Sequence, residues 1–261
     1  FPASDGPPGA VVISRRRFKR WLITDLDGTF LGGSETIRAR LSERLCSEPR
    51  DVGLIYCSGR ALSDISPLID SGVLPEPSAI IGDVGTGMWD AQGRTLASDF
   101  DDLVAERWSG VRPLLLARLH GLEGLELQTG TGPNRCSYLY SARSAAESAA
   151  RAVREIDVDT LISGGRFFDV LPRGVNKGFA VKFLIELWGL DSSSILVAGD
   201  TLNDLSMLRL SDELSGLHAL AVGNADDDLR AHFRESGRAR YSRGHGAEGI
   251  FERLEQLGWV T

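Results

Sequence analysis

The sequence predicts an α/β protein with a doubly wound parallel-sheet core and a smaller α+β cap inserted into that core. Apolar runs rich in Val, Ile and Leu recur without polar alternation, as in strands that are buried on both faces of a parallel sheet. Helix-length patterns lie between these runs, and repeated strand–helix–strand order is typical of a doubly wound core. A central segment with a different element order interrupts this alternation and predicts the inserted cap.

Five apolar runs are the predicted strands of the core. They are WLITDL (21–26), VGLIYCS (52–58), SAIIGDV (78–84), SILVAGD (194–200) and HALAVGN (218–224). The predicted helices are Glu35–Leu45, Leu62–Ile69, Gly178–Trp188 and Asp204–Leu210. A hairpin that turns at Gln92-Gly93 is expected after the third strand.

The central segment reads in the order αββαββ, which predicts an antiparallel sheet with helices on one face. Its helices are expected at Leu103–Leu119 and Ser144–Ile156, and its strands at LELQT (125–129), CSYLYSA (136–142), DTLISG (159–164) and RFFDVLP (166–172). We therefore divide the chain into a first part of the core (1–100), the cap (101–171) and a second part of the core (172–261).

Charge and composition exclude several classes of function. The 261 residues carry a formal net charge of −7, which disfavours binding to nucleic acid or to an anionic membrane surface. The basic run from Arg15 to Arg20 is interpreted as a solvated lead-in to the first strand. No apolar run is long enough to span a bilayer. Cys46, Cys57 and Cys136 lack metal-type spacing, so a reducing, cytoplasmic location is expected.

Two carboxylates, Asp25 and Asp27, stand at the end of the first predicted strand. With a side-chain period of two, both should point to one side while Leu26 points into the packing on the other. Like charges this close repel unless a cation lies between them, and Mg²⁺ is the hard cation that such a pair suits. Gly28 lets the backbone approach a ligand, and Thr29 offers a hydroxyl group.

The second strand ends in Ser58-Gly59-Arg60, where a hydroxyl and free backbone N–H groups can hold a phosphoryl oxygen. Asn176 is a predicted helix N-cap, which places Lys177 in the first helical turn. A cation opposes the helix dipole at that position, so its presence is best explained by an anion bound nearby.

The fourth strand ends in Asp200, and Asn203 and Asp204 open the next helix. Ligands of an open parallel sheet bind at the carboxyl ends of its strands, so Asp200 is expected beside Asp25. Each of these segments has an ordinary structural explanation by itself. Together their residues are suited to bind a dianionic phosphoryl group beside a divalent cation.

The segments DLDGT, CSGR, NKG and GDTLND resemble the four motifs of the haloacid dehalogenase superfamily of magnesium-dependent phosphohydrolases. The resemblance implies a Rossmann-like core, and the αββαββ segment is similar to the C2B-type cap of that superfamily. The segments IIGDVGTGMW, RFFDVLPRGVNKG and SRGHGAEGI are similar to its sucrose-phosphatase-like branch.

The resemblance implies a role for each motif residue. Asp25 would be the nucleophile and Asp27 the general acid and base, while Ser58 and Lys177 would stabilise the transferring phosphoryl group. The implied magnesium site consists of Asp25, Asp27 through its backbone carbonyl, Asp200 and Asp204. The predicted substrate contacts are Thr29, Gly59, Arg60, Gly85, Thr86, Arg166 and Asn203.

The resemblance leaves the sugar open. Gly85-Thr86-Gly87 stands where sucrose phosphatases typically have a Gly-Ser-Glu stretch, so an expected carboxylate for sugar hydroxyls is absent. Arg166 replaces the lysine of the family's cap, and bulky Phe167 and Phe168 follow it. His245 fits a substrate contact or a structural role equally well.

We therefore expect a magnesium-dependent hydrolase of a sugar phosphate, in first place a disaccharide phosphate of the sucrose-6-phosphate type, acting through an aspartyl-phosphate. Trehalose phosphate, a glycosylglycerate phosphate and an aminosugar phosphate are alternative substrates. A non-catalytic phosphatase-like module of a glycosyltransferase is the alternative from another class, and a glycosyltransferase or fused domain is the partner it implies. A phosphomutase is disfavoured because no second phosphate site is evident.

Overall fold

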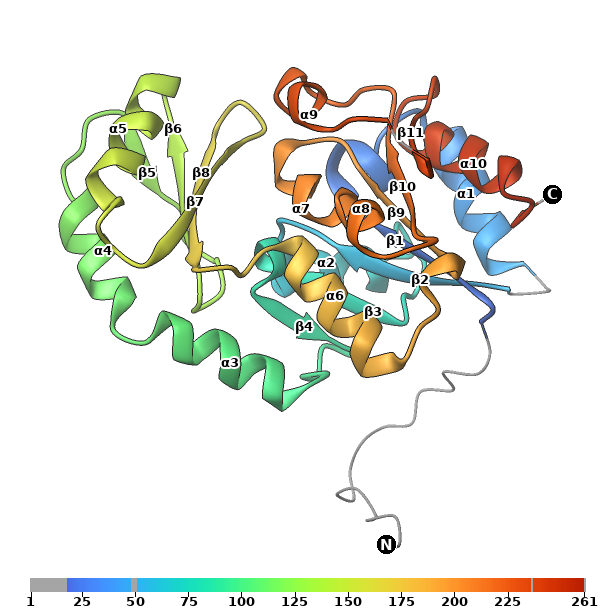
Figure 1. The fold of residues 1–261 in the computed structure, drawn as a ribbon, viewed down its shortest axis with the longest axis horizontal. Coiled ribbons are helices and arrows are strands. Elements are labelled where there is room, and N and C mark those ends of the chain that lie inside the picture. Colours follow the sequence, from blue (N-terminus) through green and yellow to red (C-terminus); the bar gives the residue numbers. More distant parts are fainter. Residues whose placement is uncertain (1–17, 48–50, 236, 261) are drawn as a thin grey trace, which may run out of the picture.

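The computed structural model describes residues 18–47, 51–235 and 237–260, and within them the chain forms two separate sheets. Figure 1 places the larger sheet and its helices on the right and the smaller sheet on the left. The larger sheet has the strand order β11-β10-β9-β1-β2-β3-β4 and is parallel except for β4, which is antiparallel to β3. Its strands are β1 (Arg20–Thr24), β2 (Val52–Cys57), β3 (Ala79–Gly82), β4 (Gly87–Trp89), β9 (Ile195–Gly199), β10 (His218–Ala221) and β11 (Ala239–Tyr241).

Helices cover both faces of this sheet, as the alternation of strand and helix predicts. One face packs against α1 (Glu35–Cys46), α2 (Leu62–Asp70) and α10 (Ala247–Gln256). The other packs against α6 (Lys177–Trp188), α7 (Leu205–Leu208), α8 (Leu210–Glu213) and α9 (Asp227–His232). In β1, Trp21 and Ile23 enter one apolar cluster and Leu22 enters the other. The doubly wound α/β core is thereby confirmed.

The smaller sheet is antiparallel, with the order β5-β6-β8-β7. Its elements are α4 (Val111–Leu119), β5 (Leu125–Leu127), β6 (Cys136–Tyr140), α5 (Arg143–Val153), β7 (Val158–Ser163) and β8 (Phe167–Pro172). Leu115 and Leu119 of α4 and Ala146 and Ala149 of α5 are buried in one apolar cluster with residues of β6 and β8. We call α4, α5 and this sheet the cap. The predicted αββαββ order agrees with these elements.

The prediction of one helix over Leu103–Leu119 is wrong. The structure contains α3 (Ser98–Trp108) and α4, and the chain breaks between them at Gly110, which has the left-handed φ of 72°. Phe100 and Val104 of α3 are buried in the core cluster, whereas Trp108 belongs to the cap cluster. Consequently α3 connects core and cap, along the lower edge of Figure 1.

Three smaller differences concern short elements. The helix predicted at Asp204–Leu210 is a short 3₁₀ turn, Leu202–Asp204, followed by α7 and α8. The turn at Gln92-Gly93 exists, but the predicted hairpin contains a single isolated β-bridge, between Trp89 and Thr95. Strand β4 pairs with β3 instead. The edge strand β11 was not predicted, because its three residues are too short to form an apolar run.

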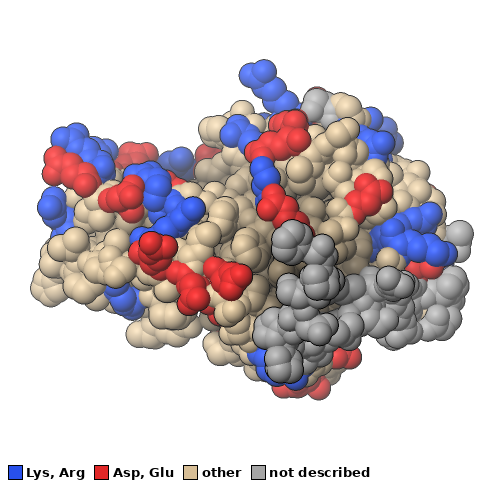
Figure 2. All heavy atoms as spheres, turned by 60° about the horizontal axis from the view of Figure 1, so that its bottom comes forward, with Lys and Arg blue, Asp and Glu red and all other residues tan. Residues whose placement is uncertain are grey.

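Charged side chains of both signs are distributed over the surface of the described chain (Figure 2). On the face drawn in Figure 2, basic and acidic side chains are interspersed in small groups. Arg15–Arg17 lie outside the described residues, whereas Arg20 belongs to β1 and donates to the carbonyl of Gly258 at 3.0 Å. Within the described part of the chain, no helix is long and apolar enough to cross a bilayer.

Candidate active site

The carboxyl ends of β1, β2 and β9 meet the cap across a cavity of about 460 Å³. Residues from both layers line it, and those predicted from the sequence are Asp25, Asp27, Gly59, Arg60, Arg166 and Asn203. The other predicted site residues lie outside this lining and are buried: Thr29, Ser58, Gly85, Thr86, Lys177, Asp200 and Asp204. The predicted site is therefore divided between cavity-facing groups and buried groups.

Strand periodicity does not explain how Asp25 and Asp27 are placed. Strand β1 ends at Thr24, and Leu26–Phe30 forms a tight turn in which Asp27 and Gly28 have non-helical dihedral angles. Both carboxylates reach the cavity and Leu26 is buried, as predicted, but the turn produces this arrangement. Gly28 has φ of 78°, and a Cβ there would lie 2.1 Å from Oδ2 of Asp200. Only glycine permits this close approach.

Lys177 is the buried cation of the site. Asn176 caps α6 by accepting from the N–H of Phe179 at 3.0 Å, as predicted, and Lys177 follows as the first helical residue. Its Nζ donates to Oδ1 of Asp25 at 2.6 Å and to Oδ1 of Asp204 at 2.7 Å, and the side chain is fully buried. Both bonds are charge-assisted, so they fix the lysine against the end of β1 and the turn that follows β9.

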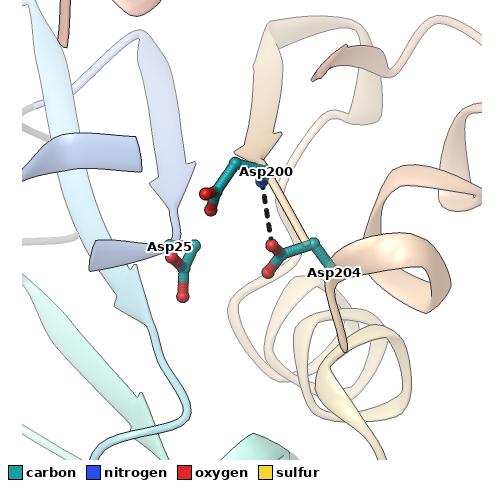
Figure 3. A group of neighbouring side chains, drawn as sticks. All are labelled: Asp25, Asp200 and Asp204. Carbon is teal, nitrogen blue, oxygen red and sulfur yellow. Dashed lines mark hydrogen bonds between the residues drawn. The ribbon is translucent and has the colours of Figure 1, made fainter. Parts of the chain in front are cut away.

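Asp200 is held by hydrogen bonds from three directions. Its Oδ1 accepts from the hydroxyl of Thr29 at 2.8 Å, and its Oδ2 lies 3.3 Å from Nδ2 of Asn224. Oδ2 of Asp204 accepts the backbone N–H groups of Asp200 and Thr201, both at 3.0 Å. Figure 3 shows the three carboxylates converging, with the bond from Asp200 to Asp204 dashed. Asp204 therefore uses both oxygens on the protein and orients the turn after β9.

Asn224 is a site residue that the sequence reasoning missed. It follows β10, and besides Asp200 it donates to the carbonyl of Gly28 at 2.9 Å and accepts from the N–H of Gly246 at 2.7 Å. It therefore ties three loops together. The rule that ligands gather at the carboxyl ends of parallel strands would have selected it, since it closes the run HALAVGN.

The electrostatic balance of the site is negative. Asp25, Asp200 and Asp204 offer oxygens within 4.8 Å of one another, and Lys177 supplies one positive charge for these three carboxylates. Burial raises the pKa of Asp25 well above its usual value, although Lys177 opposes the shift. Burial and the neighbouring Asp204 raise the pKa of Asp200 to about 7. Another cation would relieve this excess of negative charge.

The donor set fits a hard divalent cation. Carboxylate oxygens are the ligands that Mg²⁺ prefers, and Oδ2 of Asp25 has no hydrogen-bond partner among the described residues. Oδ1 of Asn203 is buried and likewise lacks a partner within the described chain, and Asn203 lines the cavity. An unpaired buried oxygen beside the carboxylates is suited to accept from a water molecule on such an ion.

Asp27 occupies a different environment from Asp25. Its side chain is 60% exposed, and its two oxygens accept from Nη2 and Nε of Arg60, both at 2.7 Å. This bidentate pair holds the Asp27 carboxylate at the cavity wall while leaving it in contact with solvent. One carboxylate of the DLDGT segment is buried against a lysine, and the other is exposed on an arginine.

The remaining predicted core residues surround this centre. Ser58 is fully buried, and its Oγ accepts from the N–H of Arg60 at 3.1 Å. Gly85 has φ of 94° and packs on the start of α6, where a Cβ would lie 2.4 Å from the carbonyl oxygen of Asn176. The hydroxyl of Thr86 donates to the carbonyl of Asp83 at 3.0 Å. Gly85 therefore supports the start of the Lys177 helix from outside the cavity, and Thr86 closes the turn at Asp83.

The cap contributes one wall of the cavity. Arg166 lies there with its guanidinium carbon 5.0 Å from the ring centre of Phe167, which also lines the cavity, whereas Phe168 is buried in the cap. The sequence reasoning missed the other polar groups of this wall, which are Gln128, Thr129, Thr131, Arg135, Ser163 and Asp169. Asp169 was detectable as a carboxylate inside the apolar run RFFDVLP.

Two further candidates lie outside the cavity lining. Cys57 is fully buried in the core, and burial raises the pKa of its thiol. His245 is exposed, and its backbone carbonyl accepts from the N–H of Glu248 at 3.2 Å at the start of α10.

Comparison with known proteins gives relatives along almost the whole chain. Residues 18–258 match the family model of sucrose-6F-phosphate phosphohydrolase. The chain is 30% identical to the mannosylfructose-phosphate phosphatase of Agrobacterium fabrum over 248 residues, which are 92% of this chain and 97% of that protein. Its fold matches the crystal structure of the sucrose-phosphatase of Synechocystis in complex with sucrose and phosphate, with a TM-score of 0.80, 26% identity and coverage of 92% and 98%.

Another relative is much longer than this chain. The glucosylglycerol-phosphate synthase of Pseudomonas anguilliseptica is 34% identical over 242 residues, which are 92% of this chain and 31% of that protein. The chain therefore spans about a third of the length of this relative.

Proposed function

Because the chain belongs to the sucrose-6F-phosphate phosphohydrolase family, we propose that it hydrolyses the phosphomonoester of a sugar phosphate, in first place a disaccharide phosphate, with the aid of Mg²⁺. One observation carries the proposal. Three buried carboxylates are clustered beside one buried lysine, which bonds two of them, and Asp25 of this cluster lines the cavity that the predicted second motif also borders. This arrangement is suited to a divalent cation and a phosphate dianion together.

Asp25 is the proposed nucleophile. Lys177 bonds Oδ1 of Asp25 and thereby fixes this side chain at the edge of the cavity. Oδ2 is then the proposed attacking oxygen. Attack of this carboxylate on phosphorus, with loss of the sugar oxygen, forms an aspartyl-phosphate, and water then releases phosphate from it. Ser58, Lys177 and the N–H groups around Gly59 are the proposed donors to the phosphoryl oxygens.

Asp27 is the proposed general acid and base. It lies on the solvent side of the cavity, where a leaving sugar oxygen and an entering water both pass. In its protonated form it donates a proton to the departing sugar oxygen, and as a carboxylate it then accepts a proton from the attacking water. The pair with Arg60 fixes the carboxylate before substrate binds, and its exchange for a sugar hydroxyl or water accompanies the proton transfers.

Asp25 and Asp200 would hold Mg²⁺ with the backbone carbonyl of Asp27, and Asp204 would orient Asp200. When bound, the ion neutralises charge on the phosphoryl oxygens and on the nucleophile. Thr29 and Asn224 bond Asp200, and Lys177 bonds Asp204, so neighbouring side chains orient both carboxylates.

The cap is the proposed sugar-recognition layer. We infer that residues 101–171 act as this cap, and that 1–100 and 172–261 contribute the core. A cavity of about 460 Å³ is large enough for a two-ring ligand, because small-molecule pockets start at about 300 Å³. Arg166, Gly59, Arg60 and Asn203, which line the cavity, remain the proposed substrate contacts, whereas Thr29, Gly85 and Thr86 are buried outside its lining and are no longer proposed as contacts. The 34% identity to the synthase favours glucosylglycerol phosphate as a second candidate substrate.

Phosphate release by the purified chain tests these proposals. The panel contains sucrose 6-phosphate, mannosylfructose phosphate, glucosylglycerol phosphate, trehalose 6-phosphate, a glycosylglycerate phosphate and an aminosugar phosphate, each with Mg²⁺ or with EDTA. We expect Mg²⁺-dependent release from one class of compound, and a loss of about 10³-fold or more in Asp25→Asn. Activity that survives this substitution would refute the proposed nucleophile.

Two outcomes of the same assay would favour the alternatives. Binding of a sugar phosphate by calorimetry without turnover of any compound would indicate a non-catalytic module, such as one fused to a glycosyltransferase. An isomeric sugar phosphate formed without free phosphate would indicate a phosphomutase.

A further inference from the structure

Arg135 belongs to the cap, yet its guanidinium group reaches the core. It immediately precedes β6, and its Nη1 donates to the carbonyl of Gly59 at 2.5 Å. The same Nη1 lies 3.5 Å from Oδ1 of Asp83, which follows β3. Arg135 is 5% exposed and Asp83 is 3% exposed. A buried positive charge of the cap therefore contacts the core directly beside the second motif.

The cap holds this guanidinium group rigidly. Nε and Nη2 lie 2.8 and 2.7 Å from Oδ1 of Asp169, and Nη2 donates to the hydroxyl of Ser137 at 3.1 Å. The hydroxyl of Ser137 in turn donates to Gln128 at 2.7 Å. Because Asp169 and Gln128 line the cavity, the residue that touches the core also orients the cap wall.

A second contact of the cap reaches the same carboxylate. The N–H of Gly132 donates to Oδ1 of Asp83 at 3.0 Å. A Cβ at Gly132 would lie 2.7 Å from Oδ2 of Asp83, so a side chain at this position would push the cap away from the core. Asp83 thus receives one charged group and one backbone N–H from the cap, and its burial depends on both.

Asp83 stands on a strained turn that touches the proposed catalytic residues. Asp83 and Val84 have φ of 50° and 58°, which non-glycine residues seldom adopt. The N–H of Asp83 donates to the carbonyl of Arg60, and the N–H of Val84 donates to the carbonyl of Ser58. Gly85 then packs on the start of α6, one residue before Lys177. One short turn therefore joins the cap contact to both phosphoryl-binding motifs.

We propose that Arg135 is a positioning residue that sets the closed position of the cap, by docking on Asp83 and on the carbonyl of Gly59. This inference rests on the proposed function, because it makes Arg135 the link between the cap wall that would contact the sugar and the core site that would bind the phosphoryl group. Without this contact, Arg135 would still bond Asp169, whereas Asp83 would lose both of its cap donors. The contact also holds the carbonyl of Gly59 beside the phosphoryl site.

The other ion pairs between cap and core among the described residues are more exposed. Arg173, which follows β8, pairs with Asp157 and Asp159 of the cap, and its side chain is 52% exposed. Nη1 of Arg143 lies 2.8 Å from Oδ2 of Asp228, but these side chains are 55% and 40% exposed. Exposed pairs contribute little because solvent screens them, whereas removal of one partner from a buried pair leaves an uncompensated charge. The position of the closed cap is therefore assigned to Arg135 and Asp83.

Hydrogen exchange of the Gly132 amide measures the docking directly, because this N–H is bonded across the contact. We expect Arg135→Met to accelerate exchange in the segment 129–135 by about 10-fold or more. Arg118→Met is the control, since Arg118 is an exposed cap arginine whose side chain donates to the carbonyl of Ala152, also in the cap. Unchanged exchange in a folded Arg135→Met protein would overturn the proposal.

Gly132→Ala is a second variant that leaves every charge in place. Gly132 is outside the left-handed region, so the substitution acts through its contact with Asp83. In both variants, kcat/KM for the sugar phosphate should fall by about 10-fold or more relative to kcat/KM for a small aryl phosphate, which does not need the cap wall. An equal fall for both substrates would contradict the assigned role.

These measurements separate the two proposals. If the wild-type chain hydrolyses no phosphate but Arg135→Met accelerates exchange, the proposed function fails and the docking contact stands. If the wild-type chain is active and exchange is unchanged, the proposed function stands and the role of Arg135 fails.

Discussion

Lys177 and Asp25 are separated by 152 residues in the chain, yet Nζ of Lys177 lies 2.6 Å from Oδ1 of Asp25 with both side chains buried. The start of α6 and the end of β1 are thus joined by one charged hydrogen bond. Because Asp204 shares the same ammonium group at 2.7 Å, this lysine is the only counter-charge that the described residues place against the three clustered carboxylates.

Lys177→Met should abolish activity and destabilise the fold. Removing one partner of a buried pair costs about 3–5 kcal/mol, because the remaining carboxylates are left uncompensated. Urea unfolding measures this loss, and phosphate release measures the activity. The matched control is Lys182→Met on the same helix, whose lysine pairs with Glu213 in an exposed position. A stability of Lys177→Met equal to that of the control would contradict the prediction.

Thr29→Val should weaken Mg²⁺ activation by about 10-fold, because the hydroxyl that orients Asp200 is lost while the side-chain shape is kept. Activity at saturating Mg²⁺ should recover to near the wild-type value. Thr24→Val is the control: its hydroxyl is also buried but donates to the backbone carbonyl of Asp25. A parallel change in Mg²⁺ dependence in both variants would argue against a specific role of Thr29.

Mg²⁺ binding should depend on pH near neutrality. The pKa of Asp200 is raised to about 7 in the metal-free protein, mainly by burial, so below pH 7 the carboxyl must lose a proton before it can bind a cation. Affinity should therefore fall by about 10-fold for each unit of pH below 7 and level off above it. Calorimetry at pH 6 in buffers of different ionisation enthalpy should detect about one released proton. A pH-independent affinity between 6 and 8 would refute this.

Stability should fall in mild acid because of His218. Burial, followed by Arg238, Arg253 and Arg240, lowers the pKa of this histidine to about 4. The unfolded chain binds a proton near pH 6.5, but the folded chain does so only near pH 4, so stability decreases as pH falls through this window. After allowance for solvent screening, the loss is about 1 kcal/mol.

The variant His218→Gln tests this origin of the acid sensitivity. Its free energy of unfolding should change less between pH 7 and pH 4.5 than that of the wild-type protein. His120→Gln, at an exposed cap position, serves as the control. Identical pH profiles for the wild-type protein and His218→Gln would assign the acid sensitivity to other groups.

Much of the fold was predictable because strands buried on both faces require continuous apolar runs. The cap was predictable from the change in element order. The break between α3 and α4 was not predictable, because Leu103–Leu119 has a helical pattern throughout. The chain turns at Gly110 because α3 packs largely in the core cluster and α4 packs in the cap cluster. The edge strand β11 was missed because pairing with β10, rather than its own composition, makes it a strand.

Local sequence patterns were sufficient to identify the chemical groups that the structure gathers at this edge of the sheet. Asp25, Asp27, Ser58, Lys177 and Asp200 were predictable because each stands at a strand end or a helix start, where local rules place it at one edge of the sheet. Tertiary structure decided how the two carboxylates of DLDGT differ, since burial against Lys177 and exposure on Arg60 depend on contacts with distant segments. The roles of Asn224 and Arg135 likewise depend on tertiary structure, because a hydrogen bond between loops or between cap and core leaves no periodic signal in the sequence.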